Sequence, residues 1–600
     1  MLIWLLAAGA AIVLAVIQYL GERRAWQTRA FALLRGVAVL LAVALALDAP
    51  RGLVSTPRPV VALDASASWL RGRADSAWGA AVARARAAAR GDTVWLVGDS
   101  LRPLRDARSA TDVATKVEPA VDRAVGAGRP LTLISDGELD DPRVLDRVLA
   151  GSRLDIVPPA STPDAAVLAL ELPRSIVGGD TAEVLVRVAA GAAGAPAGSA
   201  TLTIDKAASV RLPIDALAPG AERDVRVRVR VPVEGGEHRV VRVALSVPGD
   251  AVARNDTLGA ALDVSESPHG VFVSTAPDED ARFALDVLRG TLAIAVRAYY
   301  RVAPGVWRQE PGFTPVPEAD VRRALAAAPF AIIHGDTALF GPPRTLTTGA
   351  LALLVPATTE ADEWYAVAAP ASPLAPALAG LPWDSLPPVA IASPATGEWT
   401  ALTARRPRTL RDERSLITGS EHPRRVVIVG GSGFWRWRFR GGVSADAFSA
   451  LWGGTFDWLA AGGDDRRGAV PATAWSRAGE PVVWRRGAKR DSIVKLTLRS
   501  SGTARVDSVT LHFPGTSMLA ESPPLPEGEY DVTLAEGHAR LVVAPSREWL
   551  PRKPSVASGT IGKARATGAA PSLRDAWWPY LLLLAALCAE WLLRRRAGMR

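Results

Sequence analysis

The stretch that decides the fold reads Val60-Val61-Ala62-Leu63-Asp64-Ala65-Ser66-Ala67-Ser68. Its first four residues are apolar, and a short apolar run that ends in a polar loop is typical of a buried strand. The loop itself has the pattern Asp-x-Ser-x-Ser. One carboxylate and two hydroxyls at alternate loop positions offer the oxygen ligands that a hard cation such as Mg²⁺ prefers. The sequence therefore predicts an open α/β sheet with a metal site where its first strand ends.

Two later segments place polar residues at the same edge of that sheet. Thr93–Val97 is a second apolar run, and the loop Ser109-Ala110-Thr111-Asp112 and a predicted helix over Val113–Val125 come after it. Leu131–Ile134 is a third run and ends in Ser135-Asp136-Gly137. Loops at the carboxyl ends of neighbouring strands converge on one crevice in an open α/β sheet. We therefore expect Thr111 and Asp136 to join the Asp64 loop.

Taken in this order, the candidate ligands resemble the metal-ion-dependent adhesion site of von Willebrand factor type A (VWA) domains; they are Asp64, Ser66, Ser68, Thr111 and Asp136. The resemblance implies a Rossmann-type domain over residues 58–160 and a bound Mg²⁺ or other divalent cation. It also implies a protein partner whose acidic side chain completes the metal shell. The segment is short for this family, so sheet elements are expected to be missing. A simpler role also suits Asp64 and Ser66, as caps of the following helix.

Charge and composition argue against a nucleic-acid partner. The formal net charge is +9, but nearly all of the positive charge is arginine, and it is scattered among acidic residues rather than gathered in a stripe. The one cysteine, Cys588, lies in the last apolar segment, so no disulfide can form within the chain and no soluble part has a thiol nucleophile. The six histidines show no paired metal-ligand spacing.

Both ends of the chain are apolar enough to predict three transmembrane helices. Residues 1–20 and 30–47 form a predicted hairpin over residues 1–48, and residues 577–593 form the last span. Arginines at 23, 24 and 29, and again at 594–596, place the hairpin loop and the C-terminus in the cytoplasm by the positive-inside rule. Residues from about 49 to 575 are then periplasmic, and the protein belongs to the bacterial inner (cytoplasmic) membrane. Glu590 and Arg594, one helical turn apart, are expected to pair.

The body of the chain alternates between β and α/β patterns. Residues 165–266 contain strands in which arginine alternates with valine, which favours an immunoglobulin-like β-sandwich. Residues 468–551 predict a second small β domain, and residues 552–572, rich in small and basic residues, predict a flexible linker. The expected fold is thus multidomain α/β plus β, with a membrane anchor.

Residues 270–461 return to an α/β pattern and resemble the glutamine-amidotransferase-like domain of bacterial membrane proteins that also carry a VWA domain. The resemblance rests on domain order and on the Trp435-Arg436-Trp437 and Leu451-Trp452 segments. Class I amidotransferases use a cysteine nucleophile, which is absent here, so their chemistry is excluded. The loop at Gly430–Gly433 suits either an anion cradle or a tight turn. Ser432 is a conceivable nucleophile, but no histidine or acid can be assigned to it from the sequence.

We expect a non-enzymatic binding or scaffold protein of the bacterial cell envelope, with divalent-metal-dependent partner binding and no catalytic residues. Two alternatives remain. One is an atypical hydrolase or amidotransferase-like enzyme in residues 270–461 or at Asp64. The other is an envelope-stress or assembly factor that works with an AAA-type ATPase, as the resemblance to families with a membrane hairpin and a VWA domain suggests.

Overall fold

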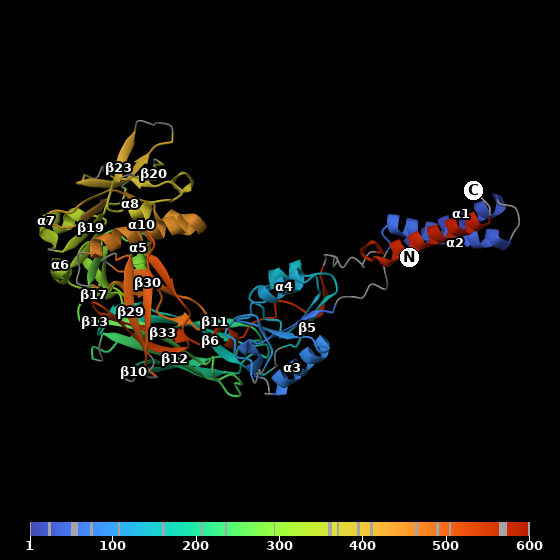
Figure 1. The fold of residues 1–600 in the computed structure, drawn as a ribbon. Coiled ribbons are helices and arrows are strands. Elements are labelled where there is room, and N and C mark those ends of the chain that lie inside the picture. The colour runs from blue at the N-terminus through green and yellow to red at the C-terminus, as the bar shows by residue number, and fades with distance from the viewer. Residues whose placement is uncertain are drawn as a thin grey trace.

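The structure is a computed structural model of the full chain and is mixed α/β plus β, with several separate sheets (Figure 1). The residues that it describes are 2–21, 26–49, 58–72, 76–105, 109–158, 162–205, 208–234, 237–292, 294–347, 349–357, 363–368, 371–392, 396–407, 412–461, 466–487, 491–502, 506–515, 517–562 and 573–597. The predicted cytoplasmic arginines at 23 and 24, and the part of the predicted linker over 563–572, lie outside these residues.

The first domain is built on a six-stranded sheet in the order β3-β2-β1-β4-β5-β34. β2, β1, β4 and β5 are parallel, and β3 and β34 are antiparallel edges. The strands are β1 (Val60–Asp64), β2 (Val94–Val97), β3 (Arg102–Pro103), β4 (Leu131–Ser135), β5 (Ser152–Ile156) and β34 (Gly559–Ile561). All five residues of β1 are buried because helices cover both faces. Val61 and Leu63 pack with α3 (Ser76–Ala89), and Val60 and Ala62 with α4 (Glu118–Gly126).

The last strand of this sheet comes from the opposite end of the sequence. β34 pairs antiparallel with β5, with Thr560 opposite Arg153. Ahead of it, η6 (Arg547–Trp549) and the extended residues after it lie against the same domain. We call residues 547–561 the C-terminal strap. The prediction of a flexible linker from residue 552 is therefore wrong for the part of it that lies in the strap. The strap also adds a strand, β34, to the sheet that residues 58–160 form.

Two β units follow, each made of two sheets around an apolar core. The first comprises β6 (Ala165–Glu171), β7 (Ser175–Val177), β8 (Thr181–Ala190), β9 (Gly198–Ile204), β10 (Ala208–Ile214), β11 (Glu222–Arg230), β12 (His238–Ser246) and β13 (Thr257–Ser265). The second comprises β26 (Ala469–Pro471), β27 (Ser476–Arg477), β28 (Val482–Arg486), β29 (Ile493–Ser500), β30 (Val506–His512), β31 (Leu519–Ser522), β32 (Gly528–Leu534) and β33 (His538–Ala544). As predicted, the β11 arginines face solvent while Val227 and Val229 are buried.

The two β units are joined rather than independent. The Trp475 indole donates to the Leu170 carbonyl at 2.9 Å, and Arg477 donates to the Leu168 carbonyl at 2.7 Å. Ala544, at the end of β33, is buried in the core of the first unit. Since β33 runs directly into the strap, this contact fixes where the strap begins.

A ten-stranded sheet in the order β17-β16-β15-β14-β18-β19-β24-β23-β22-β20 forms the third layered unit. Its central strands are parallel: β15 (Val296–Ala303), β14 (Gly270–Ser274), β18 (Phe330–His334), β19 (Ala350–Leu354) and β24 (Val426–Val429). Antiparallel strands extend both edges: β16 (Val306–Gln309), β17 (Thr314–Val316), β20 (Tyr365–Ala368), β22 (Trp399–Arg405) and β23 (Glu413–Ser420). α5 (Glu279–Asp286) and α10 (Gly442–Ala460) pack on one face, and α6 (Glu318–Ala327) on the other.

Three helices from the two chain ends lie side by side, apart from the sheets (Figure 1). They are α1 (Leu2–Gly21), α2 (Trp26–Ala46) and α11 (Trp578–Arg596). By length and composition, one described helix is long and apolar enough to cross a membrane, α2 over Arg29–Ala46, and α1 has a shorter apolar stretch. The predicted pair forms, since Arg594 donates to Glu590 at 2.9 Å, and Arg35 of α2 lies 3.5 Å from the same carboxylate.

Candidate metal centre

The Asp64 loop is closed by its own hydrogen bonds. The Ser66 backbone N–H donates to Asp64 Oδ1 at 2.9 Å, and the hydroxyls of Ser66 and Ser68 are 2.7 Å apart. From the neighbouring strand, the Ser135 hydroxyl donates to Asp64 Oδ2 at 2.6 Å. Ser66 precedes a short 3-10 helix, η1 (Ala67–Leu70), but makes no side-chain capping bond to it. The loop therefore directs three oxygen-bearing side chains inward, and all of them are buried.

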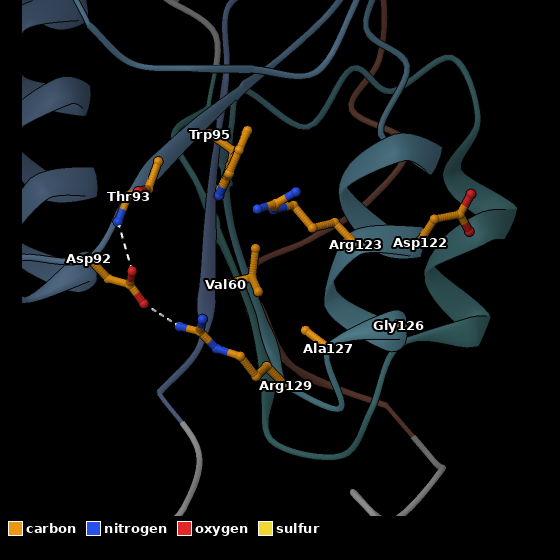
Figure 2. Close-up of a pocket in the computed structure, with 9 residues that line it drawn as sticks. All are labelled: Val60, Asp92, Thr93, Trp95, Asp122, Arg123, Gly126, Ala127 and Arg129. Atoms are coloured by element: carbon orange, nitrogen blue, oxygen red, sulfur yellow. Dashed lines mark hydrogen bonds and ion pairs between the residues drawn. The ribbon is translucent and has the colours of Figure 1, made fainter.

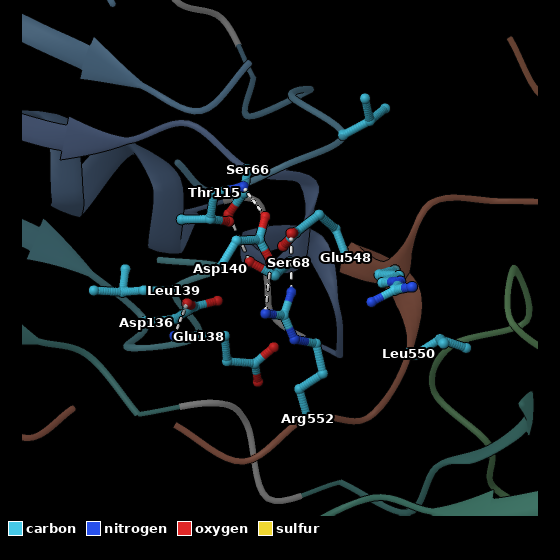
Figure 3. Close-up of polar contacts among 12 residues, drawn as sticks. Ser66, Ser68, Thr115, Asp136, Glu138, Leu139, Asp140, Glu548, Leu550 and Arg552 are labelled. Carbon is cyan, nitrogen blue, oxygen red and sulfur yellow. Dashed lines mark hydrogen bonds and ion pairs between the residues drawn. The ribbon is translucent and has the colours of Figure 1, made fainter. Parts of the chain in front are cut away.

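Asp136 follows β4 and faces the same site. Its Oδ1 accepts the Glu138 backbone N–H at 3.1 Å, which closes a tight turn around Gly137. Its Oδ2 is buried and has no hydrogen-bond partner. A buried carboxylate oxygen without a partner carries a desolvation cost that a bound cation would remove. Asp136 is close enough to Asp64 for their charges to interact, and Figure 3 shows Asp136 in the same region as Ser66 and Ser68.

Thr111 does not join them, because its side chain is exposed. The next residue, Asp112, forms a parallel bridge with Ser66 and accepts two hydrogen bonds from Arg102, both at 2.7 Å. With Asp112 held inward, Thr111 is left on the outside. Thr115 is the buried threonine instead, and Figure 3 shows it beside Ser66.

A helix boundary explains why the sequence pointed to the wrong threonine. The predicted helix over Val113–Val125 begins only at Glu118, with Pro119 in its first turn. Proline is favoured there and disfavoured further along a helix, so residues 113–117 stay in a loop. Carboxylates hold that loop, since Asp140 accepts the Thr115 N–H at 2.8 Å and Asp141 accepts the Val117 N–H at 2.9 Å. Pro119 was the signal that would have placed Thr115 in the site.

Burial and mutual repulsion of carboxylates dominate the electrostatics of the site. Burial, together with the negative charge of Asp136, raises the pKa of Asp64 to about 8. Burial also raises the pKa of Glu138 to about 7, although Arg71 pairs with this carboxylate and opposes the change. Two carboxylates that share a dry site cannot both ionise without a counter-charge. A cation or a proton must therefore accompany Asp64 and Asp136.

The residues present fit a hard divalent cation. Two carboxylates and the hydroxyls of Ser66, Ser68 and Thr115 form an all-oxygen set, which suits Mg²⁺ better than a softer metal. Among the described residues there is no group of three or more His, Cys, Asp or Glu side chains placed to hold a metal ion. A site here would therefore depend on hydroxyl ligands as well as carboxylates.

In the ten-stranded unit, the backbone N–H groups at the loop Gly430–Gly433 already bind an internal carboxylate. Asp280, in the first turn of α5, accepts the backbone N–H groups of Gly433 at 2.5 Å and Trp435 at 2.6 Å. The loop is therefore both a tight turn, with Gly433 at φ 93°, and a cradle for this internal carboxylate. Within the described part of the chain, the Ser432 hydroxyl makes no hydrogen bond to a histidine or a carboxylate, and it accepts the Ala357 N–H at 3.3 Å.

A serine, a histidine and an aspartate that the sequence did not single out lie together at the ends of β14 and β18. The Ser274 hydroxyl is 3.0 Å from His334 Nδ1, and His334 Nε2 is 3.3 Å from Asp278 Oδ1. Burial opposes ionisation of Asp278, but the hydrogen bond and charge of His334 lower the pKa of this carboxyl. Ser274 is fully buried, and Asp278 also caps α5 by accepting the Ala281 N–H.

A cavity lies at the other end of the first sheet. It has a volume of about 410 Å³ and is lined by the start of β1, the start of β2 and the end of α4 (Figure 2). Arg123 lies 3.6 Å above the Trp95 ring, and Arg129 pairs with Asp92. Because Asp64 and Asp136 are at the carboxyl ends of their strands, this cavity and the candidate metal centre are separate.

No protein family model matches the chain, and no curated protein matches it. Among solved structures, the CARDB domain of PF1109 from Pyrococcus furiosus, in complex with di-metal ions, is 17% identical, with coverage of 17% of this chain and 90% of that domain and a TM-score of 0.16. A cycloisomaltooligosaccharide glucanotransferase from Paenibacillus sp. is 15% identical over 32% of this chain and 28% of its own, with a TM-score of 0.17. A β-glucosidase from Listeria innocua is 10% identical over 38% and 49%, with a TM-score of 0.13. The chain thus spans half or less of both enzymes, and none of these similarities carries an argument about function.

Proposed function

We propose that the chain is a non-enzymatic, membrane-anchored binding protein of the bacterial cell envelope, with a VWA-type site that binds Mg²⁺ or another divalent cation. The observation that carries this proposal is the pair of buried carboxylates, Asp64 and Asp136, beside hydroxyls at 66, 68 and 115. Asp136 Oδ2 is buried without a partner, which supports a missing counter-charge. Bound Mg²⁺ would supply an electrophilic centre to which an acidic side chain of a protein partner binds.

The strand order supports a VWA-like reading of the first domain. In β3-β2-β1-β4-β5 the strands are parallel around β1, and the strand order changes direction there, since β2 lies on one side of β1 and β4 on the other. Ligands of open α/β sheets bind at such a switch point, outside the carboxyl ends of the strands. Asp64 and Asp136 follow β1 and β4 at that place. In the ten-stranded unit, the parallel centre flanked by helices is compatible with an amidotransferase-like domain that lacks its cysteine.

The proposed anchor consists of α1, α2 and α11 as three spans of the inner membrane, with the sheets in the periplasm. The ion pairs of Glu590 with Arg594 and Arg35 support the association of α11 with α2. Paired charges are far less costly than single ones near or inside a bilayer.

Metal binding and partner capture test the proposal together. The full chain, purified in detergent, is titrated with Mg²⁺ by calorimetry and used to capture envelope proteins from native membranes with and without chelator. Asp64→Ala should abolish both metal binding and chelator-sensitive capture. Asp122→Ala, which removes an exposed carboxylate of α4 that pairs with Arg147, is the matched control and should change neither. Equal capture by Asp64→Ala in the presence of chelator would refute the proposal.

A second candidate, an atypical hydrolase, is favoured by one observation only, the Ser274–His334–Asp278 relay. A serine beside a histidine that an acid orients is the arrangement of an activated nucleophile. The full burial of Ser274 favours a structural role, because a nucleophile must reach its substrate. Hydrolysis of activated esters by the purified chain, lost in Ser274→Ala but retained in Ser432→Ala, would establish the hydrolase.

A further inference from the structure

A small cavity lies between the two β units, next to Arg174. The units touch there, since the Ala261 N–H of β13 donates to the Ala474 carbonyl of the second unit at 2.7 Å. The cavity has a volume of about 10 Å³, which is room for one particle of about the size of water. Among the described residues, its charged lining consists of Arg174, Arg467, Arg540 and Asp263. Three guanidinium groups and one carboxylate thus line this space.

The carboxylate in this lining already has partners. Asp263 Oδ1 is 2.8 Å from His238 Nδ1, and Asp263 Oδ2 accepts a hydrogen bond from Arg467 at 3.2 Å. Burial opposes ionisation of Asp263, but the hydrogen bond of His238 and the charge of Arg467 lower the pKa of this carboxyl. Asp263 is therefore ionised, and its charge balances that of Arg467.

Two further arginines at this junction are also matched by carboxylates. Arg540 Nη2 donates to Glu529 Oε2 at 3.4 Å. Arg485, whose charge acts on Arg174, donates to Asp457 Oδ1 at 3.4 Å. Arg467, Arg485 and Arg540 thus each have a negatively charged partner.

Arg174 differs from these three arginines. Its guanidinium makes a single hydrogen bond within the described part of the chain, from Nη1 to the Ala472 carbonyl at 2.9 Å, and pairs with no carboxylate there. Its Nε is buried and has no hydrogen-bond partner. Burial lowers the pKa of Arg174 to about 10, and the positive charge of Arg485 adds to this effect while Asp263 opposes it. A partly buried cation without a counter-charge is costly, so an anion in the adjoining cavity stabilises it more than a water molecule does.

We propose that this cavity binds a small monatomic anion of the size of chloride, with Arg174 as its main ligand and Arg467 and Arg540 beside it. The size of the cavity excludes sulfate, phosphate and carboxylate ligands. Arg174 belongs to the first β unit, whereas Arg467 and Arg540 belong to the second, so a single ion binds both. The ion thus stabilises the contact between the two β units, and its site is independent of the candidate metal centre.

Thermal unfolding of the full chain in detergent tests the site. The protein is prepared in sodium gluconate, whose anion is too large for the cavity, and gluconate is then replaced by chloride at constant ionic strength. A ligand that binds only the folded protein stabilises it in proportion to the occupancy of its site, so chloride should raise the melting temperature. A melting temperature that is the same in both salts would overturn the inference.

Arginine variants show whether the effect comes from this cavity. Arg174→Met removes the charge and keeps an apolar stem, so the rise of the melting temperature with chloride should be lost. Arg226→Met, at an exposed position of β11 in the same unit, is the matched control and should keep the full rise. A full rise in Arg174→Met would mean that the anion binds elsewhere, and the inference would fail.

Bromide locates the ion without any substitution. Crystals of the full chain grown in sodium bromide should show an anomalous peak in the cavity, within contact distance of the Arg174 guanidinium. A cavity that holds only water in these crystals would contradict the proposal, whatever the outcome of the metal-binding experiments at Asp64.

Discussion

The hydroxyl of Thr115 is buried beside the Asp64 loop, whereas the side chain of Thr111, four residues earlier, faces solvent. This difference makes the two threonines a matched pair. Thr115→Val keeps the shape of the side chain and removes the oxygen, so Mg²⁺ affinity measured by calorimetry should fall by about 10- to 100-fold. Thr111→Val should leave the affinity unchanged. Equal losses in both variants, or a loss only in Thr111→Val, would mean that the loop is assigned wrongly.

Asp280 gives a prediction about pH that is independent of the metal. Burial raises the pKa of this carboxyl to about 6, even though the N–H groups of Gly433 and Trp435 favour its charged form. A carboxyl with a raised folded-state pKa stabilises the fold while it is protonated, and this contribution is lost as pH rises from about 4 through about 6.

Asp280→Asn removes that titration while keeping a similar shape. Relative to the parent chain, the stability of the variant should therefore increase between pH 4 and pH 7, by an amount on the order of 3 kcal/mol. The measurement is the melting temperature of both proteins in detergent across this range. A difference between them that does not change with pH would contradict the prediction.

At the scale of elements, the strands that could be predicted from the sequence are those marked by a run or an alternation of neighbouring residues. The predicted strands at 60–63, 93–97 and 131–134 correspond to β1, β2 and β4, and the alternation of valine with arginine corresponds to β11. α4 begins at Glu118, later than the predicted Val113, because Pro119 is favoured in the first turn of a helix and disfavoured further along it. Asp64, Ser66, Ser68 and Asp136, at or shortly after the ends of β1 and β4, are all buried, whereas Thr111, in the loop before the predicted helix, is exposed.

The strap is the element that local pattern could not indicate. β34 is three residues long, and its partner β5 lies about four hundred residues earlier, so neither length nor periodicity marks it. Glu548 belongs to a 3-10 turn of three residues, between Arg547 and Trp549, which has no periodic pattern of its own. Only the fold brings these residues to the Asp136 turn, through the path of β33 and its contact with the first β unit.

Alanine substitutions at Gly137 and Gly128 test whether the strap packs closely against the Asp136 turn. Both have positive φ, 91° and 63°, so alanine strains the backbone at either position by about 1–2 kcal/mol. Only at Gly137 would the new Cβ meet the strap, since nothing lies within 4 Å of a Cβ on Gly128. Gly137→Ala should therefore accelerate trypsin cleavage at Arg552 several-fold, while Gly128→Ala should not. Equal cleavage rates would show that the strap does not depend on this contact.

At the scale of the molecule, the strap brings the C-terminal part of the chain back to the domain that follows the N-terminal helices. The first domain follows the hairpin of α1 and α2, and the strap returns to that domain before the chain enters α11. The Arg574 side chain donates to the Leu45 carbonyl at 2.6 Å, so the segment before α11 is tied to the end of α2. The first domain is thus the part of the body from which both chain ends run to the proposed anchor.

The membrane orientation of this arrangement can be tested with the single cysteine of the chain. In a Cys588→Ser background, Ser508→Cys places a thiol on exposed β30 of the body, and Ala597→Cys places one just after α11. If the arginines at 594–596 remain in the cytoplasm, a membrane-impermeant maleimide added to intact spheroplasts should label Ser508→Cys and leave Ala597→Cys unlabelled until lysis. Labelling of Ala597→Cys in intact spheroplasts, with Ser508→Cys protected, would reverse the orientation. The Asp64 site would then face the cytoplasm, and a periplasmic partner for it would be excluded.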